Sequence, residues 1–90
     1  MPYLRRSPRA VRIRELLLEY RLKAGLTQAE VASLIGRTQD FVSRLENGER
    51  RLTVEDFLDI ASALNIDREH FLTDLQKIPA PPSDLNPPKR

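Results

Sequence analysis

Two short segments between residues 26 and 48 constrain the fold of this chain more than any other feature. Each is opened by a threonine, Thr27 or Thr38, and closed by a glycine, Gly36 or Gly48. A threonine hydroxyl commonly caps a helix by accepting a hydrogen bond from a backbone N–H of the first turn. Glycine commonly ends a helix because it adopts the left-handed conformation without strain. We therefore predict two short helices here, the first ending at Gly36 and the second covering residues 39–47.

The neighbouring side chains favour the same pair of helices. Glu30 follows Thr27 by three residues, which predicts a capping box, and Leu26 and Val31 have the spacing of a hydrophobic staple. Apolar residues three and four apart predict one inward face per helix, formed by Val31, Leu34 and Ile35 in the first and by Val42 and Leu45 in the second. Two short helices joined by a tight turn that contains glycine form a helix-turn-helix.

Three further helices are predicted around this pair. The first covers residues 10–24, the next runs from a cap at Thr53 to near Asn65, and the last runs from a cap at Asp67 to about Leu75. Apolar residues recur in each at helical spacing. The predicted stripes are Ile13, Leu17, Tyr20 and Ala24; Val54, Phe57, Leu58, Ala61 and Leu64; and Phe71, Leu72 and Leu75. No useful stretch alternates as a strand would, so we expect an all-α, compact five-helix bundle.

The two ends of the chain differ in composition from this bundle. Residues 1–9 contain two prolines and three arginines, and residues 78–90 contain five prolines. Proline lacks the N–H that helices and sheets require. We expect a flexible basic arm over 1–9, a helix-turn-helix domain over 10–77 and a disordered Pro-rich tail over 78–90. The arm is either a frayed terminus or a segment that lies along a polyanion.

Composition excludes several classes of function. The 90 residues contain no cysteine and one histidine, His70, so disulfides and cysteine- or histidine-rich metal sites are not expected. We find no set of nucleophile and base, and we expect no enzyme activity, no cofactor and no metal. No apolar run approaches the roughly 20 residues that span a bilayer, and no secretory signal is apparent. A cytoplasmic location is expected, with no membrane contact.

The charge is divided unevenly along the chain. Residues 1–51 carry eleven Lys and Arg against six Asp and Glu, whereas residues 52–90 carry four against seven. Twelve of the fifteen basic residues are arginines, which make two-pronged contacts with phosphates and guanine edges. The bias suits a nucleic-acid partner, although genomic base composition alone would also produce it.

The stretches GLTQAE, from Gly25, and SRLENGER, from Ser43, identify a family. At this spacing they resemble the lambda-repressor-like, Xre-type helix-turn-helix proteins of bacteria and phages, over about residues 10–75. The resemblance implies a bundle that usually binds double-stranded DNA as a homodimer. It also implies a role for each matching residue: Gln39, Asp40, Ser43 and Arg44 contact bases in the major groove, Thr27, Gln28 and Asn47 contact phosphates, and Arg21 pairs with Glu46 in a structural ion pair.

The residues themselves agree with most of these roles. If Val42 and Leu45 face the core, the polar side chains of the same helix lie on its other faces, where they can reach base edges. The N-terminus of the preceding helix, near Thr27 and Gln28, suits a phosphate. Three further residues are assigned to phosphate contacts, Thr38 at a helix start and the pair Arg50 and Arg51 in the following connector.

Some positions leave alternatives open. Phe41 either packs beside the turn or touches thymine methyl groups. Asp40 either accepts a hydrogen bond from cytosine N4 or pairs with Arg44, four residues later. Leu18 and Leu22 lie off the predicted core stripe, and either face a partner or contact the arm or tail.

The expected function is that of a sequence-specific transcriptional regulator, a homodimeric repressor of a palindromic operator. Alternatives are the antitoxin of a toxin–antitoxin pair, with its toxin bound through the tail or the spare leucines, and a restriction–modification controller. A protein-only adaptor is a further alternative.

Overall fold

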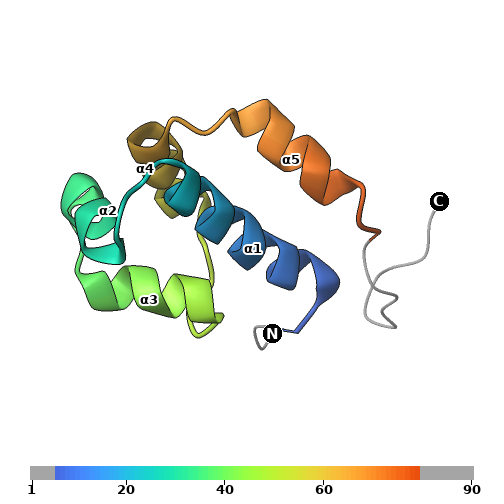
Figure 1. Ribbon diagram of the computed structural model, residues 1–90. Coiled ribbons are helices and arrows are strands. Elements are labelled where there is room, and N and C mark those ends of the chain that lie inside the picture. The colour runs from blue at the N-terminus through green and yellow to red at the C-terminus, as the bar shows by residue number, and fades with distance from the viewer. Residues whose placement is uncertain (1–5, 80–90) are drawn as a thin grey trace.

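The computed structural model describes residues 6–79, which form five α-helices and no strand (Figure 1). The helices are α1 (Pro8–Lys23), α2 (Gln28–Ile35), α3 (Gln39–Asn47), α4 (Val54–Leu64) and α5 (Arg68–Gln76). The all-α fold and the five predicted helices are thus confirmed. Residues 1–5 of the predicted arm and residues 80–90 of the predicted tail lie outside the described residues.

Local capping fixes the helix starts where the sequence predicts them. The Thr27 hydroxyl accepts from the Glu30 N–H at 3.1 Å, and the Glu30 carboxylate accepts from the Thr27 N–H at 2.8 Å, so the capping box is complete. Thr38, Thr53 and Asp67 cap the three later helices in the same position. Because these bonds join residues only three apart, the sequence alone suffices to predict them.

The start of α1 differs from the prediction by two residues. The helix begins at Pro8 rather than at Ala10, and the Ser7 hydroxyl accepts from the Ala10 N–H at 3.1 Å. Proline fits the first helical position because its missing N–H would have no partner there in any case. Pro8 and Arg9 therefore belong to the helix and not to the predicted arm.

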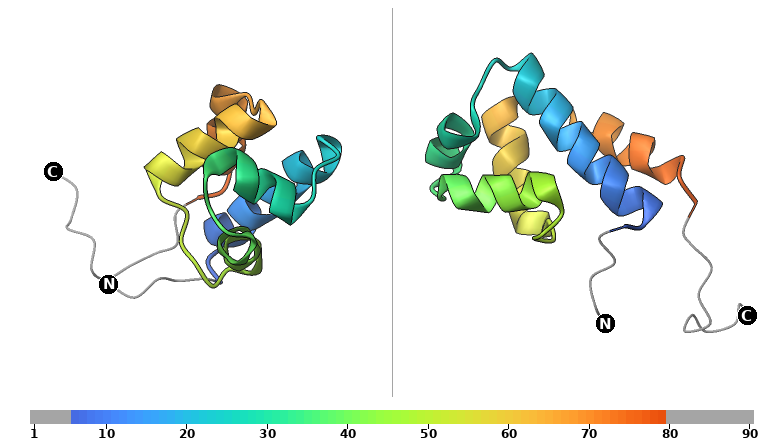
Figure 2. Two further views of the ribbon diagram at one scale, coloured as in Figure 1. Left: turned by 90° about the vertical axis from the view of Figure 1, so that its left-hand side faces the viewer. Right: turned by 60° about the horizontal axis from the view of Figure 1, so that its bottom comes forward.

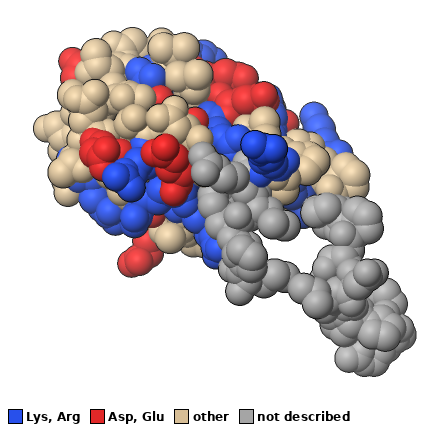
Figure 3. Space-filling view, turned by 90° about the horizontal axis from the view of Figure 1, so that it is seen from below, with Lys and Arg blue, Asp and Glu red and all other residues tan. Residues whose placement is uncertain are grey.

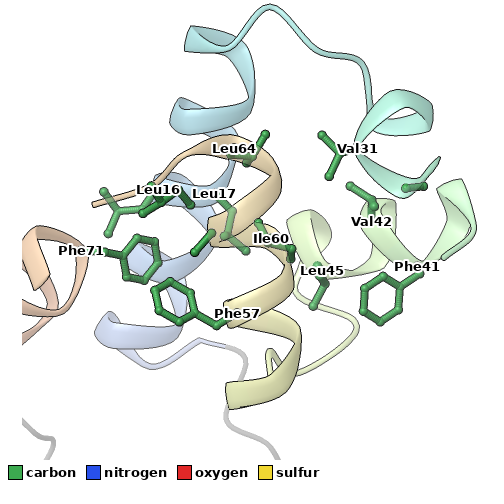
Figure 4. Packing of buried hydrophobic residues seen from close by; sticks show 13 residues of the cluster. Leu16, Leu17, Val31, Phe41, Val42, Leu45, Phe57, Ile60, Leu64 and Phe71 are labelled. Atoms are coloured by element: carbon green, nitrogen blue, oxygen red, sulfur yellow. The ribbon is translucent and has the colours of Figure 1, made fainter. Parts of the chain in front are cut away.

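The helices enclose one core. α2 packs against α3 and α4, and α1 lies across α3 and alongside α5 (Figures 1 and 2). The rings of Phe57 and Phe71 contact each other at a tilt of 44°, with their centroids 4.7 Å apart, on one side of the core (Figure 4). Phe41 lies at the α3 end of the cluster, away from these two rings. The buried cluster draws on all five helices: Leu16, Leu17, Val31, Ala32, Phe41, Val42, Leu45, Phe57, Ile60, Ala61, Leu64, Ile66 and Phe71.

Several residues of the predicted inward stripes face solvent instead. Leu34 is 60% exposed and Val54 is 76% exposed, and Leu58, Leu72 and Ala24 are exposed as well. The neighbouring helices cover only part of each predicted apolar stripe, so its outer residues stay in solvent. Val54 and Ala24 are exposed because they lie at helix ends. Ile60, outside the predicted stripe of α4, is buried in its place.

Polar contacts tie α5 to α1. The Arg12 guanidinium donates from Nη2 to Asp74 Oδ2 at 3.1 Å, and Arg9 Nε donates to the Ile78 carbonyl at 2.8 Å. Leu18 and Leu22 are both exposed on α1. Within residues 6–79, no helix is long and apolar enough to cross a membrane.

Candidate nucleic-acid interface

The outer face of α3 carries two adjacent rows of polar side chains. Residues four apart share one face of a helix, so Gln39, Ser43 and Asn47 form one row and Asp40 and Arg44 form the other. Val42 and Leu45 are buried on the opposite side. Gln39, Asp40, Arg44 and Asn47 are exposed, and Ser43 is half-buried. The structure thus brings the four predicted base contacts to one surface.

Asp40 and Arg44 contact each other within this surface. Arg44 Nε donates to Asp40 Oδ2 at 2.8 Å, and both side chains are more than half exposed. This is the second of the two arrangements expected for Asp40. The carboxylate partly neutralises Arg44 in the free protein, so Arg44 must leave an internal partner to meet a base.

The row formed by Gln39, Ser43 and Asn47 is uncharged. Asn47 Nδ2 donates to the Ser43 hydroxyl at 3.4 Å, and both groups lie toward the end of α3. Amides and hydroxyls both donate and accept, so this row can meet either acceptors or donors on base edges.

A network of three polar side chains holds this surface in place. Arg21 donates to both carboxylate oxygens of Glu46, at 2.7 and 3.0 Å, and to the Leu26 carbonyl at 3.0 Å. Gln28 Nε2 donates to the same carboxylate at 2.9 Å. The hydrogen bonds from Arg21 to Glu46 raise the pKa of the arginine. The predicted pair therefore joins α1 to α3, and Gln28 adds α2.

This network occupies the side-chain amide of Gln28. Its side-chain amide, expected to contact phosphate, is engaged by Glu46. Thr27 and Thr38 use their hydroxyl oxygens as caps, but each hydroxyl still carries a hydrogen that can be donated. Both threonines are exposed, so they remain suited to a phosphate oxygen.

Two open hollows adjoin α3. One, of about 510 Å³, is lined by Thr27, Gln28 and Gln39, together with residues of the turn after α1. The other, of about 540 Å³, lies on the side of Asp40 and Arg44 and is lined also by Arg37, Phe41 and Arg50. Each hollow thus includes part of the polar rows of α3, Gln39 in the first and Asp40 with Arg44 in the second.

Charged and aromatic groups contact each other in the second hollow. The Arg37 and Arg50 guanidinium carbons lie 4.2 and 4.7 Å from the centre of the Phe41 ring. Phe41 is only 7% exposed, so it packs beside the turn, as one of its two expected roles required. Arg37 Nη2 also donates to Asp56 Oδ1 of α4 at 2.9 Å.

Sequence reasoning missed Arg37 and Asp56. Arg37 lies in the turn before α3, where helical spacing does not apply, so its contact with Phe41 had no signal in the sequence. Asp56 stands at the third position of α4, where a capping box prefers glutamate, and its side chain turns to Arg37 instead. The remaining predicted phosphate contact, Arg51, is exposed in the connector after α3.

The α3 side of the molecule is rich in basic groups. Figure 3 shows the molecule from below, the side on which α3 lies in Figure 1, and lysine and arginine surfaces are spread over this face with carboxylates among them. No group of three or more potential metal ligands occurs in the described part of the chain. The surface suits an extended polyanion better than a small molecule, because its hollows are open and shallow.

Comparisons with known proteins agree with this geometry. The helix-turn-helix family model matches residues 17–71. An uncharacterised HTH-type transcriptional regulator, y4dJ of Sinorhizobium fredii (strain NBRC 101917 / NGR234), is 36% identical over 59 residues, which are 66% of this chain and 77% of that protein. The structure of an XRE-family like protein from Pseudomonas syringae pv. tomato str. DC3000 is 43% identical. Its TM-score is 0.72, over 77% of this chain and 84% of that one.

Proposed function

This chain belongs to the Xre-type family of helix-turn-helix DNA-binding regulators, and from that premise we propose that it is a homodimeric repressor that recognises a palindromic operator through α3. Gln39, Asp40, Ser43 and Arg44 contact base edges in the major groove. Thr27, Gln28, Thr38, Asn47, Arg50 and Arg51 contact the phosphates around them. Regulators of this family are generally non-enzymatic, and the proposal includes no catalytic step.

The observation that carries the proposal is the surface of α3. Four polar side chains lie together on one face of a helix whose other face is buried in the core. A major groove about 12 Å wide admits one α-helix, and arginine bound to guanine is its commonest specific contact. In this proposal Arg44 makes that contact once it releases Asp40, and the Gln39 amide contacts adenine.

A dimer is proposed for geometric reasons. One short helix spans few base pairs, so two copies related by two-fold symmetry would double the recognised sequence. Successive major grooves on one side of the duplex lie about 34 Å apart, so the half-sites should be centred one helical turn apart. Such a dimer on a promoter would exclude RNA polymerase. The proposed location is the cytoplasm, with the bound form on the nucleoid.

Selection of bound duplexes from a random library tests the proposal. The purified protein, at about physiological salt, should enrich a two-fold-symmetric motif. Arg44→Ala should lose preference at one base step per half-site, a discrimination of roughly 1–3 kcal/mol, and should keep its thermal unfolding temperature. Arg68→Ala is the matched control, because Arg68 is an exposed arginine whose Nη2 donates to Ser62.

The outcomes separate the parts of the proposal. An enriched motif without symmetry would refute the homodimer, and an unchanged motif with Arg44→Ala would remove Arg44 from the base contacts. Absence of any enriched sequence would refute sequence-specific recognition and favour a partner-dependent role such as that of an antitoxin.

A further inference from the structure

The hollow beside Arg37 is lined by several charged side chains. Three arginines line it, Arg37, Arg44 and Arg50, and two of them are paired with carboxylates. Arg44 is paired with Asp40, and Arg37 with Asp56. Arg50 makes no ion pair with any carboxylate among residues 6–79, and its guanidinium lies over the Phe41 ring. The hollow therefore retains one uncompensated positive charge.

Arg37 donates a hydrogen bond to the buried carboxylate of Asp56. Asp56 is only 3% exposed, and its Oδ1 accepts from Arg37 at 2.9 Å. Its Oδ2 is buried and makes no hydrogen bond within the described residues. Burial of a carboxylate is costly unless a cation accompanies it, so Asp56 favours the presence of Arg37 at this edge of the hollow.

Phe41 holds the two arginines near each other. Both guanidinium carbons lie within 5 Å of one ring centre, so two positive charges meet at Phe41 and repel each other. Cation–π contact partly offsets that repulsion. An anion that bridges the two guanidiniums would remove it, and guanidinium groups match the oxygens of a phosphate in both spacing and planarity.

We infer that Arg37 and Arg50 together bind one phosphodiester of the DNA backbone along the Asp40 and Arg44 side of α3. Phe41 and Asp56 are positioning residues, which set the separation and direction of the two guanidiniums. The inference rests on the proposed function, because the hollow adjoins the row of α3 that would contact bases. It adds Arg37 to the contacts and gives the otherwise structural Phe41 and Asp56 a role in affinity.

The salt dependence of binding tests this inference. Each phosphate contact adds about 0.9 to the slope of log affinity against log salt on duplex DNA. Because Arg50 remains beside the same phosphate, Arg37→Gln should reduce the slope by up to this amount, weaken binding to every duplex by a similar factor and leave the preferred sequence unchanged. Arg68→Gln, an exposed arginine on α5, should keep the full slope.

Two more variants guard against a folding effect. Arg37→Gln alone leaves the Asp56 carboxylate buried without its cation, so the double variant Arg37→Gln with Asp56→Asn removes both charges and should show the same loss of slope. Phe41→Leu keeps an apolar side chain and both arginines but removes the ring, and it should also lower the slope. Thermal unfolding of each variant shows that it is folded at the assay temperature.

The results distinguish the inference from the proposed function. If wild-type protein binds duplexes with a steep slope and the double variant keeps that slope, Arg37 contacts no phosphate and the inference is wrong. A changed sequence preference in Arg37→Gln would equally overturn it, because phosphate contacts carry no direct sequence information. If wild-type protein binds no duplex, the proposed function fails as well. Competition by inorganic phosphate alone, at the concentration of DNA phosphates, should not displace the duplex; displacement would show a site for free phosphate.

Discussion

At the scale of single residues, the contact between Arg21 and Glu46 should dominate the stability of the α3 surface. The two side chains are 13% and 9% exposed, and the guanidinium makes two hydrogen bonds to the carboxylate. Arg21→Met leaves the carboxylate with Gln28 as its remaining side-chain partner. Removing one member of a buried pair costs about 3 kcal/mol, so we expect the free energy of unfolding, measured by urea denaturation, to fall by about that amount.

The reciprocal double variant is the control for this prediction. Arg21→Met with Glu46→Leu replaces both charges by apolar groups, an exchange that is often neutral for a buried pair. Most of the lost stability should therefore return. Equal midpoints for wild type and Arg21→Met would show that the pair contributes nothing measurable.

Contacts between residues close together in the sequence could be predicted, whereas contacts between distant segments could not. Asp40 and Arg44 are four residues apart on one helix, so the sequence predicted their contact as one of two alternatives. The sequence did not predict Arg37 and Asp56, because that contact exists only once α4 has packed beside the turn before α3. Phe41 had two possible roles for the same reason.

At the scale of helices, a cap residue should contribute more to the free energy of unfolding than an exposed residue inside a helix. Thr27→Ala removes the oxygen that accepts from the Glu30 N–H but leaves the Thr27 backbone bond to the Glu30 carboxylate possible. Loss of an N-cap typically costs about 1 kcal/mol. We expect that decrease in the free energy of unfolding, together with faster hydrogen exchange at the Glu30 amide. Thr73→Ala, an exposed change inside α5, should cost far less, and equal costs at both sites would refute a capping role.

Helix boundaries were predictable because caps and stops act locally, whereas the buried faces were only partly so. Gly36 and Gly48 take the left-handed conformation that ends α2 and α3, as their positions predicted. Leu34 fits a helical stripe on spacing alone, yet it is exposed. Which part of a stripe is covered depends on where the neighbouring helix lies, and spacing within one helix carries no information about that.

At the scale of the whole molecule, the parts of the chain that differ in charge meet where α5 packs against α1. The basic half of the sequence forms α1 to α3, and the acidic half forms α4 and α5. Arg12 joins the two halves through Asp74, and it also donates to Glu15 and Glu19 at 3.2 and 3.1 Å. The attachment of α5 to α1 therefore depends on ionised carboxylates as well as on the burial of Phe71.

This dependence predicts how stability should change with pH. The hydrogen bond from Arg12 lowers the pKa of Asp74 below its ordinary value. A carboxyl group with a lowered pKa in the folded state stabilises the fold fully above its unfolded pKa of about 3.9, and this contribution is lost as the pH falls through the folded pKa. The variant Asp74→Asn should therefore be less stable than wild type by a constant amount from about pH 5 to pH 7, and the difference should shrink below about pH 4.

Asp59→Asn, an exposed change on α4 that makes no ion pair within residues 6–79, is the matched control. Urea denaturation across this pH range gives the free energy of unfolding of wild type and of both variants. A difference between wild type and Asp74→Asn that persists undiminished in acid would show that Asp74 acts through its shape and not through its charge.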